Sequence, residues 1–296
     1  MPRVFVMRVL KLYKVLPEVI ELSDALSLEV ISRYPSKGKR RTPLLFIHGA
    51  FTAAWCWSEH FLDWFAERGW PAHAVSVRGH GGSEGHEQLG NWGIDHYVAD
   101  VMQVVDEIGE APVLIGHSMG GFVVQKCLEQ AEFPAAVLMC SVPPKGLLAS
   151  SLSMMWSHPD LMGSLSQLMT GGPVDIDSLK DALFAQPASI SDLQRYLMLS
   201  QMESQRAIWD MTMFNLIKPE RLKPVPKLII GAELDHIIPA NQVRDTAEVY
   251  GVEPVIFPGM GHGMMLERDW DHVAGVLNDW LSAVVADAPP AKKTAT

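Results

Sequence analysis

The sequence predicts an α/β protein with a mostly parallel central sheet flanked by helices and with an inserted helical cap. Short, continuously apolar runs alternate with stretches of helical period, and such runs are typical of strands buried on both faces of a parallel sheet. A Gly-x-Ser-x-Gly motif lies between one of these runs and a helix-like stretch. The strand-like runs stop near residue 143 and resume at residue 227, which indicates an insertion.

Turn-forming residues separate the expected elements, so each strand or helix has recognisable limits. The alternation of strands with helices predicts βα units, in which the carboxyl ends of the strands meet at one edge and bind ligands there. The expected strands are residues 28–34 as an edge strand, 44–48, 72–77, 112–115, 135–140, 227–231 and 254–257. The expected helices are residues 55–68, 94–108, 121–128, 240–250 and 268–285.

The predicted domain organisation follows from a change of pattern after Pro143. Residues 1–142 and 221–286 form the expected core, and residues 143–220, which carry many methionines and no strand-like run, form the expected helical cap. Residues 287–296 are rich in Pro, Ala and Lys and are expected to be disordered.

Composition bounds the class of protein. The chain has 296 residues, 48% of them hydrophobic and 20% charged, which suits one large α/β domain with an insertion or two small domains. The net charge of −10 disfavours a nucleic-acid partner. No apolar run reaches the length of a membrane span, so we expect no membrane partner. The oligomeric state, monomer or dimer, is left open.

The cysteines and the N-terminal stretch suggest a reducing compartment. Cys56, Cys127 and Cys140 form neither a disulfide framework nor a metal-binding spacing. Arg8 and Lys11 interrupt the N-terminal apolar residues, which also lack the small-residue cleavage site of a signal peptide. The sequence therefore predicts a cytoplasmic protein.

The motif at residues 116–120, Gly-His-Ser-Met-Gly, predicts a nucleophile elbow with Ser118 at its tip. The turn between strand and helix is sharp, and its flanking positions have no room for a Cβ atom, which glycine lacks. Such a turn exposes the serine hydroxyl at the carboxyl edge of the sheet. It also places the backbone N–H of Met119 at a helix start, where it can bind a developing oxyanion.

A serine nucleophile needs a base and a group that orients the base. His262 lies in a Gly-rich loop directly after the last strand and is the candidate base. Asp235 follows an earlier strand and is the candidate orienting acid, with Glu233 as its competitor. The order Ser, Asp, His along the chain is the order expected for this elbow. No carboxylate follows the strand that ends at Cys140, the other place for such an acid.

A second oxyanion donor is expected from the loop after residues 44–48. The backbone N–H of Ala50 is the first choice and that of Phe51 the second, while Met119 supplies the other donor. Gly49 lets this backbone bend toward the substrate. His48 is interpreted as a brace for the loop.

The methionine-rich cap is ordinary helical core, a deformable apolar wall over the site, or both. Met155 and Trp156 in the cap, and His117 in the elbow, are the candidate substrate-binding residues. An apolar acyl or ring group suits such a wall better than a sugar or phosphate, and no Gly-rich phosphate cradle is present. We therefore expect a small-molecule substrate.

No cofactor and no metal are expected. Histidines 80, 86 and 96 lie in or near one long loop, but they lack a metal-binding spacing such as His-Glu-x-x-His.

Together these segments resemble the α/β-hydrolase superfamily, over roughly residues 28–140 and 222–285, with the cap at the usual insertion point. Ser76 departs from the pattern, because many members carry an aspartate there that braces a loop. The residues that carry the resemblance are Ile47-His48-Gly49-Ala50, Arg78-Gly79-His80-Gly81-Gly82-Ser83, Gly116-His117-Ser118-Met119-Gly120-Gly121, Gly231-Ala232-Glu233-Leu234-Asp235 and Gly261-His262.

The resemblance implies a serine hydrolase with a Ser-His-Asp triad, acting through an acyl-enzyme on an ester or thioester-like bond. The Trp-Cys-Trp sequence at residues 55–57 is similar to small capped members: carboxylesterases, carbon–carbon bond hydrolases, lactonases and hydroxynitrile lyases. A serine at the elbow argues against haloalkane dehalogenases and epoxide hydrolases, which use a carboxylate nucleophile. The alternatives are a carbon–carbon bond hydrolase or lyase on the same triad, or a small-molecule receptor on a hydrolase scaffold.

Overall fold

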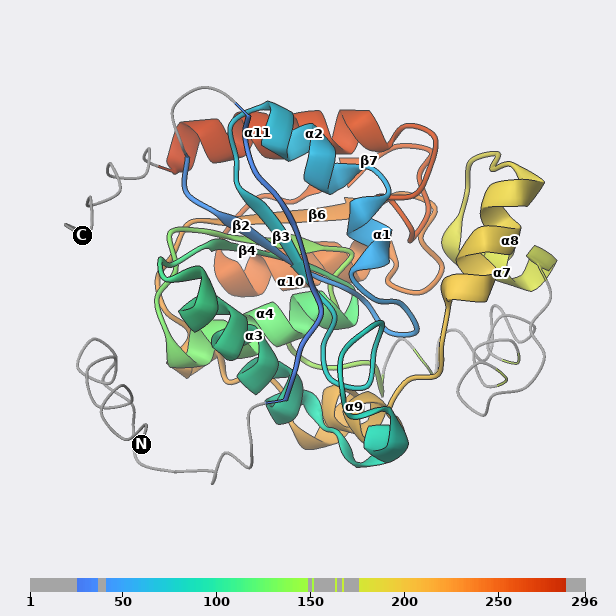
Figure 1. The fold of residues 1–296 in the computed structure, drawn as a ribbon, viewed down its shortest axis with the longest axis horizontal. Coiled ribbons are helices and arrows are strands. Elements are labelled where there is room, and N and C mark those ends of the chain that lie inside the picture. The colour runs from blue at the N-terminus through green and yellow to red at the C-terminus, as the bar shows by residue number, and fades with distance from the viewer. Residues whose placement is uncertain are drawn as a thin grey trace.

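A seven-stranded sheet forms the centre of the chain, in a computed structural model that describes residues 26–36, 41–148, 151, 163, 167 and 176–285 (Figure 1). The strand order is β1-β3-β2-β4-β5-β6-β7, and all neighbours pair in parallel except β1, which runs antiparallel to β3 at the edge. This confirms the predicted fold class and the predicted edge strand. The strands are β1 Val30–Arg33, β2 Leu44–Ile47, β3 Ala72–Val75, β4 Val113–His117, β5 Ala136–Met139, β6 Lys227–Ala232 and β7 Val255–Phe257.

Helices cover both faces of the sheet (Figure 1). One face carries α1 (Trp55–Ser58), α2 (Phe61–Glu67) and α11 (Trp270–Val284). The other carries α3 (Ile94–Ile108), α4 (Met119–Gln130) and α10 (Ala240–Tyr250).

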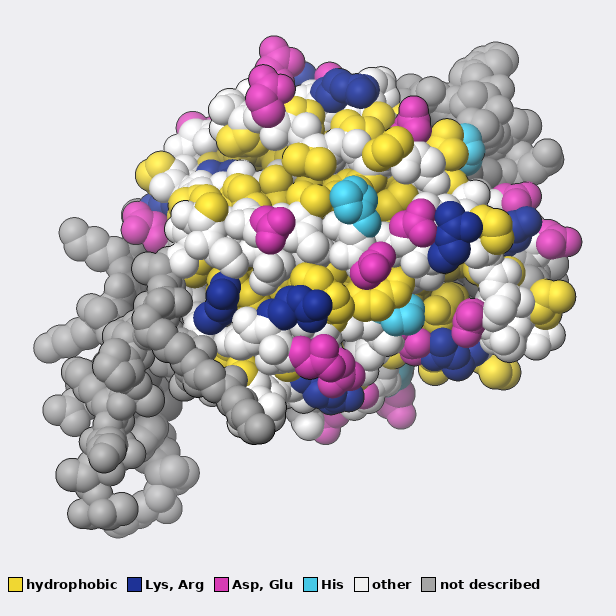
Figure 2. Space-filling view, turned by 90° about the horizontal axis from the view of Figure 1, so that it is seen from above, with side chains coloured by type: hydrophobic (Ala, Val, Ile, Leu, Met, Phe, Trp, Pro, Cys, Tyr) yellow, Lys and Arg dark blue, Asp and Glu magenta, His cyan; other side chains and the backbone are white. Residues whose placement is uncertain are grey.

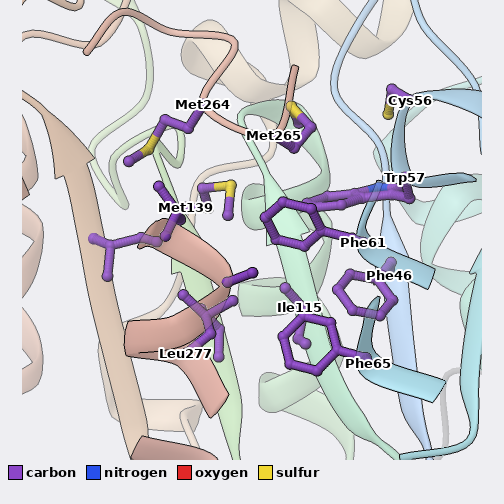
Figure 3. Packing of buried hydrophobic residues seen from close by; sticks show 14 of the residues in the cluster. Phe46, Cys56, Trp57, Phe61, Phe65, Ile115, Met139, Met264, Met265 and Leu277 are labelled. Carbon is purple, nitrogen blue, oxygen red and sulfur yellow. The ribbon is translucent and has the colours of Figure 1, made fainter. Parts of the chain in front are cut away.

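The two faces have separate apolar cores, because successive side chains of a strand point to opposite sides. In β2, Leu44 and Phe46 belong to one buried cluster, and Leu45 and Ile47 belong to the other. Figure 3 shows part of the first cluster, where the rings of Phe46, Phe61 and Phe65 pack with Leu277 of α11. Every strand between the edges is therefore buried on both sides, as the continuous apolar runs predict.

The predicted single helix over residues 55–68 is wrong in one respect: it is two helices, α1 and α2. His60 leaves the helical conformation with φ −140°, and its ring stacks on Trp270 of α11 at 4.6 Å with an interplanar angle of 4°. No Gly or Pro marks this break, so only the contact with a distant helix accounts for it.

Helices without a strand make up the described residues between β5 and β6. They are α7 (Ile176–Leu183), α8 (Ile190–Leu199), α9 (Gln205–Trp209), a π-helical turn (Asp210–Phe214) and a short 3-10 helix (Pro219–Arg221). Helices α7 and α8 lie to one side of the sheet, at the right of Figure 1. Ala207, Met211 and Ile217 instead join the buried cluster of α3 and α4. The boundaries of a cap at residues 143–220 stay a prediction, and the tail at residues 287–296 lies outside the described residues.

The outer surface over α2 and α11 carries acidic and basic side chains interspersed with apolar ones (Figure 2). No helix in the described part of the chain is both long and apolar enough to cross a membrane.

Two glycines permit the closest backbone approach in the sheet. A Cβ atom on Gly116 in β4 would lie 2.3 Å from the carbonyl oxygen of Gly120 in α4. A Cβ atom on Gly120 would lie 2.3 Å from the carbonyl oxygen of Ile47 in β2. Both carbonyl oxygens belong to the backbone, so they cannot move aside for an added Cβ atom as a flexible side chain can. Strand β4, helix α4 and strand β2 are therefore in direct backbone contact.

Replacing Gly116 with Ala should destabilise the protein by about 3 kcal/mol or more, because the added methyl overlaps the α4 backbone. Urea unfolding monitored by circular dichroism measures this. Gly275→Ala in α11 is the matched control, since nothing lies within 4 Å of its added Cβ. That variant should gain up to about 1 kcal/mol from helix propensity. Equal stability of the two variants would contradict the packing argument.

Candidate active site

The non-glycine residues with a strained backbone lie at one edge of the sheet. Among the described residues, the non-glycine residues with positive φ are Phe51 at 66°, Ser118 at 54° and Cys140 at 43°. Ser118 and Cys140 directly follow β4 and β5, and Phe51 lies in the loop after β2. These three strands are neighbours in the sheet. Each such residue costs of order 1–3 kcal/mol and persists only where its surroundings hold it, as at active sites.

Ser118 is held by its backbone on both sides. Its N–H donates to the carbonyl oxygen of Met139 at 3.0 Å, and its own carbonyl accepts from Phe122 and Val142. It immediately precedes α4, whose first N–H groups have no acceptor within the helix. The N–H of Met119 therefore lies beside the serine, free of the helix ladder. This is the elbow geometry that the motif predicts.

His262 and Asp235 form a buried hydrogen-bonded pair. Nδ1 of His262 lies 2.7 Å from Oδ2 of Asp235, and both side chains are at most 4% exposed. Because a carboxylate accepts, Nδ1 carries the proton and Nε2 is left as the basic atom. Oδ1 of Asp235 accepts from the N–H groups of Ile237 and Ile238, each at 2.8 Å. Burial alone would raise the pKa of Asp235, but His262 and these hydrogen bonds hold it below its usual value.

The competing acid, Glu233, lies elsewhere. Its side chain is exposed and accepts from the N–H of Gly259 at 3.0 Å. The geometry therefore pairs Asp235, not Glu233, with His262. Within the described residues, no hydrogen bond joins the Ser118 hydroxyl to His262; such bonds commonly tighten only when substrate binds.

His117 holds the backbone of the loop that contains His262. Its Nε2–H donates to the backbone carbonyl of His262 at 2.9 Å, and the two rings lie 4.6 Å apart. Burial, and then the neighbouring His262, lower the pKa of His117 to about 3, so the ring is neutral. A direct contact of His117 with substrate stays a prediction. Met155 and Trp156 lie outside the described residues.

The loop after β2 lies against Ser118. A Cβ atom on Gly49 would be 3.1 Å from Cβ of Ser118. The carbonyl oxygen of Gly49 accepts from Nδ1 of His48 at 2.8 Å and from Oγ1 of Thr52 at 3.0 Å. In a trans peptide the N–H points opposite to the carbonyl, so these bonds also fix the direction of the Ala50 N–H.

His48 is the brace that the sequence predicts. Its Nε2 accepts from the N–H of Val77 at 3.2 Å, which leaves Nδ1 as the donor to Gly49. Burial, and then the nearby His80, lower its pKa to about 3, so it stays neutral. The loop that offers Ala50 and Phe51 is thus tied to β3 through one ring.

Ser76 stands where the sequence departs from the pattern that it resembles, and the carboxylate of Glu29 lies within hydrogen-bond distance of it. The Ser76 hydroxyl donates to Oε2 of Glu29 at 2.6 Å and accepts from the N–H of Ala54 at 3.0 Å. The same carboxylate oxygen accepts from the N–H of Gly82. The loop is therefore braced by a serine directly after β3 and a glutamate directly before β1, a pairing that no local motif shows.

Cys140 lies beside Asp235, a contact that the sequence did not predict. Its thiol hydrogen-bonds Asp235, and burial, followed by that carboxylate, raises the thiol pKa well above its usual value, so the thiol donates. Its Sγ lies 3.4 Å from Sδ of Met264. The one feature of the sequence that could have indicated this contact is the position of Cys140. It directly follows β5, and a triad acid can also lie after this strand.

Ligand-type side chains meet at one point in the described residues. Donor atoms of Cys140, Asp235 and His262 all lie within 4.8 Å of one another, and those of Asp235 and His262 are already joined by a hydrogen bond. The loop histidines instead have separate partners: His80 bonds Glu203, His86 bonds the Gly81 carbonyl, and His96 accepts from Gly93.

Comparisons with known proteins find curated relatives that match part of the chain and solved structures with the same fold. Epoxide hydrolase A of Mycobacterium tuberculosis is 32% identical over 114 residues, which are 38% of this chain and 35% of that protein. The chain matches only about a third or less of the length of its curated relatives.

Solved structures show the same fold at low sequence identity. The bromoperoxidase from Bacillus anthracis superposes with a TM-score of 0.69 at 18% identity, covering 88% of this chain and 97% of that one. An esterase from Exiguobacterium antarcticum superposes with a TM-score of 0.67 at 18% identity and the same coverage.

The model of the Alpha/beta hydrolase family matches residues 44–276, which run from the first strand of the parallel sheet to the middle of α11. This span includes Ser118, the Asp–His pair and the loop after β2. The chain therefore belongs to the alpha/beta hydrolase family.

Proposed function

We propose that this hydrolase is a cofactor-free serine esterase that cleaves an ester or thioester-like bond with an apolar acyl part. One observation carries the proposal. Ser118, with φ 54° and ψ −117° at the end of β4, lies against the loop after β2, and a buried Asp–His pair follows the strands on one side of it. The groups that acyl transfer would need lie near one edge of the sheet, which supports the proposal.

In the proposed reaction, Nε2 of His262 accepts the hydroxyl proton as Oγ of Ser118 attacks the ester carbonyl. The backbone N–H groups of Met119 and Ala50 bind the oxyanion that forms. His262 then gives its proton to the leaving alcohol or thiol, and an acyl-serine remains. Water, deprotonated by His262, releases the carboxylic acid. The ionised Asp235 holds the His262 tautomer and stabilises the imidazolium.

A serine at the elbow is the reason to propose ester chemistry over the epoxide opening named for the curated relatives. Ring opening of an epoxide in this fold proceeds through a carboxylate nucleophile, and residue 118 offers a hydroxyl. Esterases and an enol-lactonase are among the solved structures with this fold, which is compatible with the proposal.

The apolar acyl part is proposed from the side chains around His262. Met264 and Met265 follow the histidine and belong to the buried cluster that contains Met139 and Trp57 (Figure 3). Phe184, Leu193 and Tyr196 from α8 and the residues before it join the same cluster. Apolar side chains thus continue from the sheet to the inserted helices.

We further propose that residues 143–220 act as the cap. The N–H of Gly263, next to the catalytic histidine, donates to the carbonyl of Leu183 in α7 at 2.7 Å. Glu267 joins the two segments again, because Oε1 accepts from the N–H groups of Gln186 and Gly261. Met155 and Trp156 remain the proposed substrate contacts in the cap.

Ester hydrolysis can be tested with p-nitrophenyl esters from acetate to palmitate. We expect a maximum in kcat/KM at one chain length, because a buried apolar pocket has a fixed depth. Initial rates of the purified chain measure it. Rates at background level across the whole series would contradict the proposed function.

Replacing Ser118 with Ala should abolish turnover, because the attacking oxygen is removed, and should leave the fold intact. The measurement is ester hydrolysis together with the far-UV circular dichroism spectrum. Retained turnover in the folded variant would rule out Ser118 as the nucleophile.

Asp235→Asn should lower kcat by roughly 10⁴-fold, because the amide favours the wrong tautomer of His262. Glu233→Gln is the matched control, since this carboxylate is exposed and bonds only a loop N–H. It should keep kcat within about twofold of the original chain if Asp235 is the acid. Steady-state kinetics measures kcat of both variants. A large loss in Glu233→Gln together with a nearly unchanged kcat in Asp235→Asn would assign Glu233 as the acid.

A further inference from the structure

Residues 201–204, which join α8 to α9, bind the loops behind the candidate oxyanion hole; we call them the clamp segment. The backbone N–H of Gln201 donates to the carbonyl oxygen of Phe51 at 2.9 Å. Its side-chain amide donates to the carbonyl of Gly79 at 2.7 Å and accepts from the N–H of Gly81 at 2.9 Å. One residue of the inserted region thus ties the oxyanion loop to the loop after β3.

Glu203 makes the second attachment of the clamp segment. It is 3% exposed, and its carboxylate accepts from Nε2 of His80 at 3.0 Å and from the hydroxyl of Tyr97 at 2.7 Å. The N–H of Ser204 donates to the same carboxylate at 2.7 Å. A carboxylate with three donors is fixed in position, although it lies away from water.

The hydrogen bonds of His80 show that this contact is an ion pair. Nδ1 of His80 lies 3.1 Å from the carbonyl oxygen of Arg78, and Nε2 faces Glu203. Both partners are acceptors, so both ring nitrogens must carry protons. Burial alone would lower the pKa of His80, but Glu203 outweighs it and raises that pKa above its usual value. The pair is therefore charged and buried.

The ion pair reaches the oxyanion loop through two neighbouring rings, whose planes are tilted by 47°. The centroid of His80 lies 5.1 Å from that of His48. His48 in turn donates to the carbonyl of Gly49, the bond that sets the direction of the Ala50 N–H. A shift of Glu203 would move His80, then His48, then the donor at Ala50. Gln201 holds the other end of the same loop at Phe51.

We propose that Glu203 and Gln201 are positioning residues that set the geometry of the oxyanion hole from the inserted region. The inference rests on the proposed function, since it assigns Ala50 as an oxyanion donor. A buried charge pair is suited to this task, because it is strong only in one geometry, whereas apolar contacts tolerate sliding. The clamp segment thereby couples the inserted helices to transition-state binding and not to substrate binding.

Glu203→Gln and Gln201→Ala test the inference. Glu203→Gln removes the charge and keeps an acceptor for Tyr97, and Gln201→Ala removes two loop contacts at a half-buried position. On the best p-nitrophenyl ester, kcat should fall about 10²-fold for Glu203→Gln and by a smaller factor for Gln201→Ala, with KM within about threefold. Circular dichroism confirms folding, and Gln201→Ala carries the test if Glu203→Gln does not fold.

The matched control is Asp210→Asn. Asp210 also belongs to the inserted region and accepts from a backbone N–H, that of Ile94 at 3.0 Å, but it has no contact with the oxyanion loop. It should keep kcat. A loss equal to that of Glu203→Gln would overturn the inference, because the effect would then be a general one of loosening the insertion.

Binding of an arylboronic acid separates this inference from the proposed function. Boronates form a tetrahedral adduct with a serine, and the adduct places an oxygen in the oxyanion hole. Boronate affinity should fall in parallel with kcat in the two clamp variants. If both fold and keep boronate affinity and kcat within twofold, the inference is overturned. Boronate binding without ester turnover by the unaltered chain would overturn the proposed function alone, and absence of both would overturn both.

Discussion

The close approach of strand β4, helix α4 and strand β2 is the constraint on which the candidate site depends. Gly116 and Gly120 allow these backbones to touch, and a Cβ atom at either position would overlap a carbonyl group. The contact forces the chain to turn sharply at Ser118 and holds its positive φ of 54°. Gly49 extends the same contact, because it lies against His117 and Ser118. Packing of the sheet and placement of Ser118 therefore have one cause.

Burial gives the polar groups around this contact their character. His48 and His117 are buried without a carboxylate partner, and their neutral rings serve as directional donors to the carbonyls of Gly49 and His262. Asp235 is equally buried, but it stays ionised because it accepts hydrogen bonds from His262 and from two backbone N–H groups. In a low-dielectric environment each of these bonds is stronger than in water, and each unpaired group would be costlier. Equally buried side chains thus differ in charge, since His48 and His117 are neutral and Asp235 is ionised, because their hydrogen-bond partners differ.

Much of the fold could be predicted because it depends on local patterns. Continuous apolar runs marked the buried strands, and the predicted limits of two helices, residues 94–108 and 240–250, match α3 and α10. The break at His60 could not be predicted, since its partner, Trp270, lies more than two hundred residues away. The same applies to Glu29, which lies directly before β1 and accepts from the hydroxyl of Ser76, 47 residues away. Such contacts leave no periodic trace in either segment.

The sequence by itself determined the sheet, the elbow at Ser118 and the order of the candidate acid and base, because strand ends and glycine positions are local features. Tertiary structure alone decided between Asp235 and Glu233, since only one of these carboxylates turns toward His262. It also brought Cys140 to the acid and Glu203 to His80. Those contacts join segments separated by tens to more than a hundred residues, and hydrogen bonds of that range depend on where the sheet places each strand end and loop.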